Sequence, residues 1–117
     1  MAITIYGIPN CDTVKKARDW LTKHRIDAQF HDYKKAGIDK AHLTAWCREF
    51  GWEKVLNRAG TTFRKLTDDQ KEGLTATRAI ALMQQQPSLI KRPMLDIDGK
   101  LVLGFKPETY AAAFKRG

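Results

Sequence analysis

The chain has 117 residues, of which 43% are hydrophobic and 29% are charged. These values are typical of one soluble globular domain and exclude a disordered or fibrous chain. No apolar run approaches the ~18 residues that a membrane span needs, and the two cysteines are too few for a disulfide-rich secreted scaffold.

The chain is basic, with 21 Lys and Arg residues against 13 Asp and Glu residues and a formal net charge of +8. Such a charge attracts nucleic acids, anionic membranes and small anions alike. Because the basic residues are spread along the chain without a dense run, we predict no direct nucleic-acid binding and no membrane binding. The first residues show no secretory signal, so we expect a cytoplasmic protein.

The first third of the chain predicts a βαβ unit. The β-branched and aromatic run at 2–6 favours a buried strand, which Gly7 and Pro9 end. A helix is expected from Cys11, with Asn10 as its cap. A second strand fits residues 28–33, and this order of elements implies a parallel pair of strands. The apolar stripe of the helix consists of Val14, Ala17, Leu21 and His24.

Residues 38–86 predict an enlarged helical insertion. Asp39 is expected to cap a first helix, with a short continuation around Trp52. Residues 67–70 have the pattern of a capping box, and Thr75 is expected to open a further helix that Pro87 ends. The first helix has the apolar face Leu43, Trp46, Cys47 and Phe50, and the last has Ala76, Ala79, Ile80 and Met83.

The last third predicts a β-hairpin and a helix. Apolar runs at 94–97 and 100–103 flank Asp98-Gly99, a strong hairpin signal, and Pro107 is typical of a helix start. The order β-α-β, helices, β-β-α is that of an α/β thioredoxin-like fold with a mixed four-stranded sheet. We therefore expect a single domain over residues 1–117.

The two cysteines stand in different contexts. Cys47 lies on the apolar face of its predicted helix, which is typical of a small buried hydrophobic residue. Cys11 follows a strand and a Gly/Pro/Asn loop at the start of a helix, where free amide groups and the helix dipole favour a thiolate. We therefore predict that Cys11 is a reactive nucleophile.

The chain has no second thiol next to Cys11. A dithiol oxidoreductase carries Cys-x-x-Cys, but Val14 occupies the second position here. Cys47 is distant in sequence and expected to point inward, which makes it a weak resolving thiol. A redox cycle at Cys11 then needs an external thiol to resolve its mixed disulfide or sulfenic acid, and glutathione is the cytosolic candidate.

Basic residues offer an anion site, whereas a metal site is not expected. Arg58 and Arg92 can bind carboxylates or oxyanions bidentately, and Lys106 offers a single charge, although each of the three taken alone also fits a surface position. The histidines lack the spacing of a zinc site, and no Gly-rich phosphate loop is present. We expect no metal and no tightly bound cofactor.

Several motifs in the same order resemble those of the arsenate reductase-related family, which contains the ArsC, Spx and YffB proteins. These motifs lie at residues 5–18, 56–66, 91–93 and 104–105. The chain looks most like the YffB branch, which is associated with glutathione-dependent thiol reduction. The resemblance implies a thioredoxin-like fold with a helical insertion and makes Cys11 the catalytic thiol. It also implies that Arg58 and Arg92 hold an anion and that Pro93 is a cis proline facing the thiol.

Three departures from the family pattern bear on the activity. Gly7 stands where arsenate reductases have a histidine, and Lys106 stands where they have a third arginine, which keeps the charge but loses the bidentate fork. Both count against arsenate reduction. Val14 replaces the second cysteine of the Cys-x-x-Cys switch that many Spx proteins carry, so that switch cannot operate here.

We therefore expect a glutathione-dependent thiol-disulfide oxidoreductase with glutathione as co-substrate. Cys11 reacts with an oxidised substrate, and a glutaredoxin or another protein is a candidate partner of a monomeric enzyme. Two alternatives stay open: an arsenate reductase linked to glutathione and glutaredoxin, and a non-catalytic Spx-like regulator that binds RNA polymerase. The expected substrate-binding or anion-binding residues are Arg58, Arg92, Pro93, Lys106 and Asn10.

Overall fold

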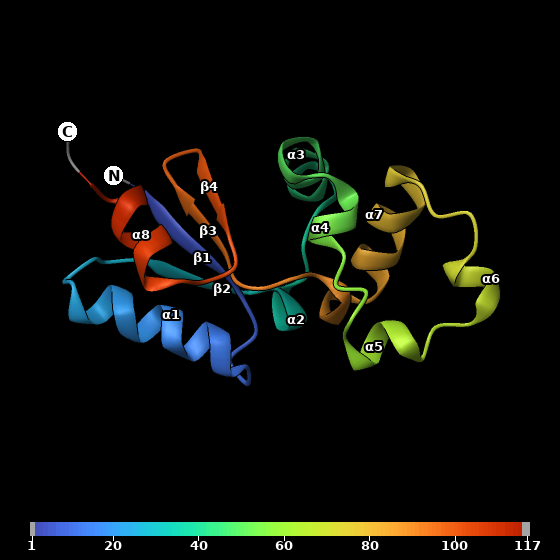
Figure 1. Cartoon of the computed structure of the whole chain (residues 1–117), viewed down its shortest axis with the longest axis horizontal. Helices are drawn as coiled ribbons and strands as arrows, with labels where there is room; N and C mark the ends of the chain where they lie inside the picture. The colour runs from blue at the N-terminus through green and yellow to red at the C-terminus, as the bar shows by residue number, and fades with distance from the viewer. Residues whose placement is uncertain (1, 116–117) are drawn as a thin grey trace. The chain divides into compact units, whose positions relative to one another are not determined.

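The computed structural model describes residues 2–115, which divide into two compact units (Figure 1). One unit joins Met1–Ala36 with Arg92–Gly117, and the other is Gly37–Lys91. The first unit contains the sheet and the second is helical. That the whole chain behaves as a single domain stays a prediction.

The sheet unit has four strands in the order β2-β1-β3-β4. Strand β1 (Ile3–Gly7) pairs in parallel with β2 (Gln29–Asp32) and antiparallel with β3 (Met94–Ile97), which pairs antiparallel with β4 (Lys100–Leu103). The parallel pair is the one that the βαβ pattern predicts. The expected fold class, an α/β thioredoxin-like fold with a mixed four-stranded sheet, is therefore confirmed.

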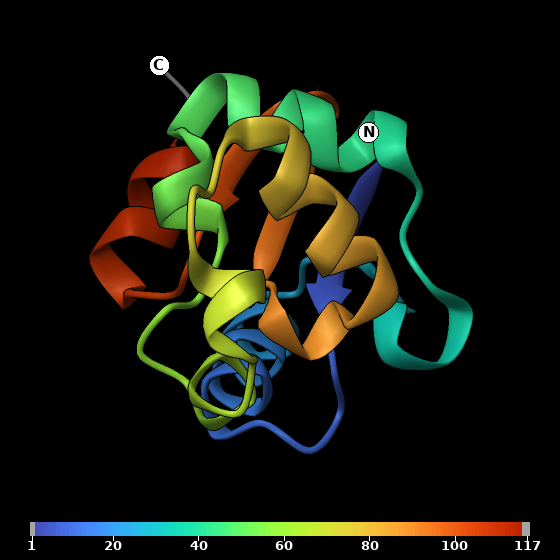
Figure 2. The same ribbon diagram turned by 90° about the vertical axis from the view of Figure 1, so that its right-hand side faces the viewer.

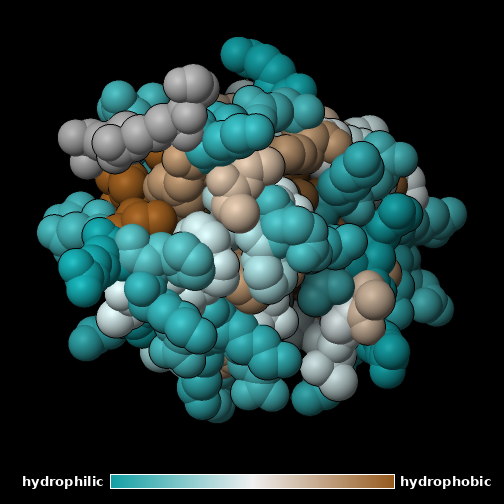
Figure 3. All heavy atoms as spheres, turned by 60° about the vertical axis from the view of Figure 1, so that its left-hand side comes forward, coloured by the Kyte–Doolittle hydropathy of each residue, from teal (hydrophilic) through white to brown (hydrophobic). Residues whose placement is uncertain are grey.

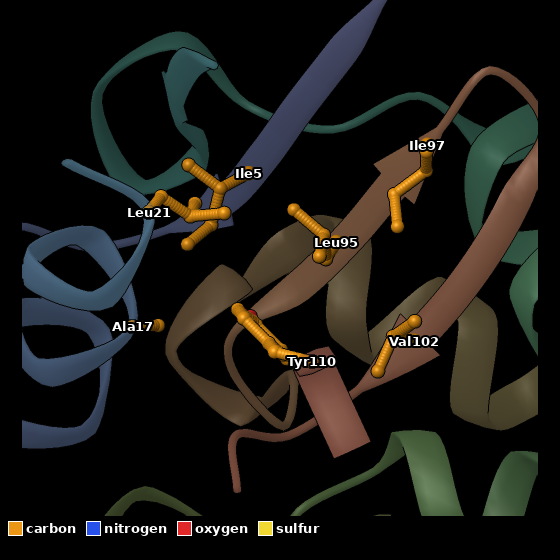
Figure 4. Close-up of a cluster of buried hydrophobic side chains, with 7 residues drawn as sticks. All are labelled: Ile5, Ala17, Leu21, Leu95, Ile97, Val102 and Tyr110. Carbon is orange, nitrogen blue, oxygen red and sulfur yellow. The ribbon is translucent and has the colours of Figure 1, made fainter. Parts of the chain in front are cut away.

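Two helices supply apolar side chains to the core of this unit, α1 (Asp12–Lys23) and α8 (Pro107–Ala113). Ile5 pairs with Leu95 and Leu95 pairs with Val102, so the three residues form a row across the sheet. Figure 4 shows the side chains of α1 and α8 directed towards this row. The cluster consists of Ile5, Ala17, Leu21, Leu95, Ile97, Val102 and Tyr110.

The hairpin and the last helix form as predicted. Asp98 and Gly99 both have positive φ angles, 52° and 98°, which a two-residue turn between twisted strands requires and which Asp-Gly supplies at low cost. Pro107 occupies the start of α8, where its missing N–H has no helical partner to lose.

Two expectations about α1 are wrong. The N-cap is Cys11 and not Asn10, because Cys11 is extended (φ −145°, ψ 124°) while its carbonyl already accepts the N–H of Lys15 at 2.9 Å. His24 is the C-cap of the helix rather than part of its buried stripe. It is exposed and stacks on Trp20, with ring centroids 3.8 Å apart.

The second strand ends one residue earlier than predicted. Tyr33 is fully buried and opens a short helix, α2 (Tyr33–Ala36). Asp32 causes this turn, because its Oδ1 atom accepts the backbone N–H groups of Lys34 at 3.1 Å and Lys35 at 3.3 Å. An aspartate that binds the amides two and three residues ahead competes with continuation of the strand.

The helical unit starts with α3 (Lys40–Phe50) and α4 (Trp52–Val55), which follow one another across Gly51, a glycine with φ of 88°. Asp39 caps α3 as predicted, accepting the N–H of His42 at 2.8 Å. Leu43, Trp46 and Cys47 are buried, as the apolar periodicity predicts.

The remaining helices of this unit are α5 (Thr61–Arg64), α6 (Asp68–Lys71), α7 (Ala76–Gln85) and the 3-10 helix η1 (Pro87–Leu89), which Figure 2 shows from another side. The capping box at Thr67 and Gln70 and the cap at Thr75 are confirmed. The expectation for Ala76 is wrong: it is exposed at the first helical position, and Leu82 joins Ala79, Ile80 and Met83 in the core.

Within residues 2–115, no helix combines the length and hydrophobicity that crossing a membrane requires. In the view of Figure 3, the surface is mostly hydrophilic and interrupted by a small hydrophobic area. This agrees with the high proportion of charged residues in the sequence.

Candidate active site

The register of the sheet brings three chain segments together at the C-terminal end of β1. Gly7, the last residue of β1, pairs with Asp32 at the end of β2. On its other side Tyr6 pairs with Met94, so Pro93 enters the sheet next to Gly7. The loop that leads to Cys11 starts at this same point, which explains how residues distant in sequence come to share one site.

Cys11 lies at the N-terminus of α1 and is half-buried. The Cys11 side chain itself forms no capping hydrogen bond at this helix end. The first amide groups of a helix lack partners within the helix and carry partial positive charge. The predicted position of Cys11 at the start of this helix is confirmed, and its reactivity stays a prediction.

Gly7 and Val14 are packed against each other beneath this loop. A Cβ atom on Gly7 would lie 2.8 Å from Cγ2 of Val14, which is fully buried. Carbon atoms do not approach this closely in folded proteins, so a larger residue at position 7 must displace Val14. The residues at positions 7 and 14 therefore depend on each other, because they fill one space.

Tyr33 is a site residue that the sequence analysis missed. Its side chain forms a hydrogen bond with that of Arg92 and interacts electrostatically with Cys11 and Asp32. Burial raises the pKa of Tyr33, the Arg92 guanidinium and the hydrogen bond to it lower this pKa, and the charges of Cys11 and Asp32 raise it further. Arg92 is half-buried, and the hydrogen bond with Tyr33 restricts the position of its guanidinium group.

The structure gives the other predicted residues different places. The Arg92–Pro93 peptide bond is cis, as the resemblance implies, and Pro93 is buried. Lys106 is exposed and is the N-cap of α8, where its carbonyl accepts the N–H of Tyr110 at 3.0 Å. Arg58 belongs to the helical unit, is exposed and lies over the ring of Trp52 at 5.7 Å. Its role beside Cys11 stays a prediction.

A cavity of about 270 Å³ opens within the sheet unit, beside the loop that leads to Cys11. Asn10, which directly precedes Cys11, is among its lining residues, so this predicted residue is placed at a cavity although it does not cap the helix. The sequence analysis missed the charged residues of the cavity; the signal that it overlooked is a pair of lysines directly after a strand. The cavity is lined by Ile8, Pro9, Asn10, Asp32, Lys34 and Lys35.

Cys47 occupies a different environment. Both cysteines are free thiols, but only 8% of the surface of Cys47 is exposed, and burial raises its pKa. A buried neutral thiol is a poor nucleophile. Among the described residues no three His, Cys, Asp or Glu side chains gather closely enough to hold a metal ion.

Comparison with known proteins gives a consistent match. The model of the ArsC family matches residues 6–113. A solved protein named YffB is 56% identical, with a TM-score of 0.95, over 97% of this chain and all of the other. An arsenate reductase (ArsC) related protein from Brucella melitensis is also 56% identical, with a TM-score of 0.76, over 99% of this chain and 97% of the other. The global transcriptional regulator Spx of Streptococcus pyogenes is 29% identical over 97% of this chain and 86% of its own length.

Proposed function

Because this chain belongs to the ArsC family, we propose that it is a single-cysteine thiol-disulfide reductase that uses Cys11 as its nucleophile and glutathione as the resolving thiol. The observation that carries the proposal is the setting of Cys11. It lies at a helix N-terminus and interacts electrostatically with Tyr33, whose side chain is hydrogen-bonded to Arg92. The position of a second active-site thiol is filled by a buried valine, so the resolving thiol comes from outside the chain.

The proposed cycle has two exchange steps that balance. The Cys11 thiolate attacks the glutathione sulfur of a mixed disulfide, so that a Cys11–glutathione disulfide forms and the substrate thiolate leaves and takes a proton from water. A glutathione thiolate then attacks the glutathione sulfur of that adduct, which releases glutathione disulfide and restores the Cys11 thiolate. In sum, one mixed disulfide and one glutathione yield one substrate thiol and one glutathione disulfide.

Residues around Cys11 have distinct tasks in this cycle. The helix end stabilises the thiolate both as nucleophile and as leaving group. Arg92 attracts carboxylates of the glutathione moiety, and its planar fork fixes their orientation. Tyr33 keeps Arg92 in place through the hydrogen bond between their side chains.

The proposal is tested by comparing two cysteine variants in a steady-state assay with a glutathione mixed disulfide, such as that of 2-mercaptoethanol. Cys11→Ser is expected to abolish turnover, because no other thiol occupies the site. Cys47→Ser is the matched control and is expected to retain turnover, since Cys47 is buried. Full turnover by the Cys11→Ser variant would rule the proposal out.

The similarity to Spx supports a second candidate, a regulator that binds a large protein such as RNA polymerase. This function requires a binding surface but no turnover at Cys11. It predicts that wild type and Cys11→Ser co-purify with the same partner. Arsenate reduction has less support, because Gly7 and Lys106 replace residues that the resemblance associates with it; an assay with arsenate, glutathione and glutaredoxin measures it directly.

A further inference from the structure

The cavity lined by Asn10, the residue before Cys11, combines charges of both signs. Lys34 and Lys35 line it, and both side chains are exposed and so accessible to a ligand. Asp32 lines it as well and is half-buried. The Asp32 carboxylate accepts hydrogen bonds from the backbone amides of Lys34 and Lys35, so this carboxylate and the two lysine side chains belong to one short turn.

This arrangement favours a zwitterion over a simple anion. An oxyanion or an isolated carboxylate would be attracted by the two ammonium groups but repelled by the Asp32 carboxylate. The end of an amino acid carries a carboxylate and an ammonium group on one carbon atom, and it can therefore satisfy both signs of charge. Ile8 and Pro9 add an apolar wall against which a methylene chain can pack.

We propose that this cavity binds the amino-acid end of a γ-glutamyl thiol peptide such as glutathione. The α-carboxylate contacts Lys34 and Lys35, and the α-ammonium group contacts Asp32. Asn10 lines the cavity and directly precedes Cys11, so a peptide held there has its cysteine near the reactive thiol. The inference rests on the proposed function, since it names the part of glutathione that this site recognises.

Binding is measured separately from thiol chemistry with S-methylglutathione, whose sulfur cannot form a disulfide. Titration into the ¹⁵N-labelled protein is expected to shift the backbone amide signals of Asn10, Lys34 and Lys35. The N-acetyl derivative of S-methylglutathione lacks the ammonium group and is expected to bind at least about fivefold more weakly, the effect of roughly one charge-assisted hydrogen bond. An analogue with its glycine carboxylate converted to an amide is expected to keep these shifts.

The matched variants are Lys34→Met/Lys35→Met and Lys23→Met/Lys100→Met. All four lysines are exposed and belong to the sheet unit, and both pairs remove the same charge, but only the first pair lines the cavity. We expect the first pair to weaken S-methylglutathione binding about tenfold relative to the second, in a protein whose melting temperature is comparable. Equal affinities of the two double variants, or equal binding of the N-acetyl derivative, would overturn the inference.

A second measurement separates this inference from the proposed function. The rate at which Cys11 forms a mixed disulfide with the uncharged bis(2-hydroxyethyl) disulfide depends on the thiol and not on the cavity. If Cys11 does not react with it while S-methylglutathione still binds, the proposed function fails and the binding site stands. If Cys11 reacts but the lysine pair does not affect S-methylglutathione, the site fails and the thiol chemistry stands.

Discussion

Tyr33 and Tyr110 are both completely buried, yet their hydroxyl groups have opposite surroundings. The side chain of Tyr33 is hydrogen-bonded to that of Arg92 and interacts electrostatically with Cys11. The hydroxyl group of Tyr110 has no hydrogen-bond partner among the described residues. The two residues therefore form a natural pair for separating a positioning role from a purely structural one.

We predict that Tyr33→Phe slows the reaction of Cys11 with glutathione disulfide at least about tenfold, the effect of roughly one hydrogen bond to a charged group. The change keeps the buried ring but releases Arg92. Because the lost interaction orients a cation, the effect is expected to be larger for glutathione disulfide than for the uncharged bis(2-hydroxyethyl) disulfide. Rates at increasing disulfide concentration measure both values.

Tyr110→Phe is the control for this experiment. It removes a buried hydroxyl group of the same kind at a residue whose place is in the core cluster with Ile5 and Leu95. We expect the two disulfides to react with this variant in the wild-type ratio. An equal change of that ratio in both variants would contradict a role of Tyr33 in placing Arg92.

The packing of β1 against α1 depends on the absence of a side chain at Gly7. We predict that Gly7→Ala destabilises the protein by about 1–3 kcal/mol, because the new Cβ would lie 2.8 Å from Cγ2 of the buried Val14. Urea unfolding measures this difference. The expected loss of stability arises where β1 contacts α1, since Gly7 is the last residue of the strand and Val14 lies in the first turn of the helix.

The double variant Gly7→Ala/Val14→Ala tests the cause. If the clash with Val14 is the reason, removal of the valine methyl groups relieves it, and the two substitutions cost less together than the sum of their separate costs. Strictly additive costs would place the effect of Gly7→Ala elsewhere, for example in the backbone of the loop before Cys11.

The elements that sequence analysis predicts well are those with local signals. Asp98-Gly99 specifies its turn by two residues that accept positive φ angles, and the Thr67 capping box needs only its own four residues. The buried faces of α1, α3 and α7 follow from helical periodicity apart from the end residues His24, Phe50 and Ala76, which are not buried, and the additional core residue Leu82. Helical periodicity does not predict burial at the ends of a helix, because the exact end of a helix is uncertain and its last residues can lie beyond the surface on which the helix packs.

The site is less predictable because it depends on pairing between distant segments. Cys11 and Pro93 can be recognised from motifs, but the role of Tyr33 requires the register that sets Asp32 against Gly7 and Pro93 beside it. The lysines of the cavity escape for a similar reason. In the sequence of a basic chain, two adjacent lysines are typical of a solvated surface. Only the structure shows that the turn at Asp32 places them at the same cavity as Asn10.

At the scale of the whole molecule, two effects oppose each other as the pH rises. The net charge of +8 falls, which relieves self-repulsion and favours the compact state. Against this, burial raises the pKa of Tyr110 and of Cys47, and burial is the largest influence on the raised pKa of Tyr33. The folded chain holds these protons more tightly than the unfolded chain, in which Cys and Tyr titrate at about 8.5 and 10.

We therefore predict that the protein loses stability as the pH rises above about 9, where the unfolded chain releases these protons and the folded chain retains them. Below the unfolded pKa values the contribution of these groups to stability is fully present. Above them each group lowers the free energy of unfolding by up to about 1.4 kcal/mol per pH unit until its folded pKa is reached.

Tyr110→Phe isolates this effect, because it barely alters the net charge at neutral pH. Urea unfolding between about pH 8 and 10.5 is expected to give this variant a flatter decline above pH ~10 than the wild type. At neutral pH the same variant should be more stable by about 1 kcal/mol, since a buried hydroxyl group without a partner among residues 2–115 is removed. Parallel pH profiles of the two proteins would show instead that Tyr110 reaches water or a partner when it ionises, and would leave Tyr33 and Cys47 as the source of the alkaline loss of stability.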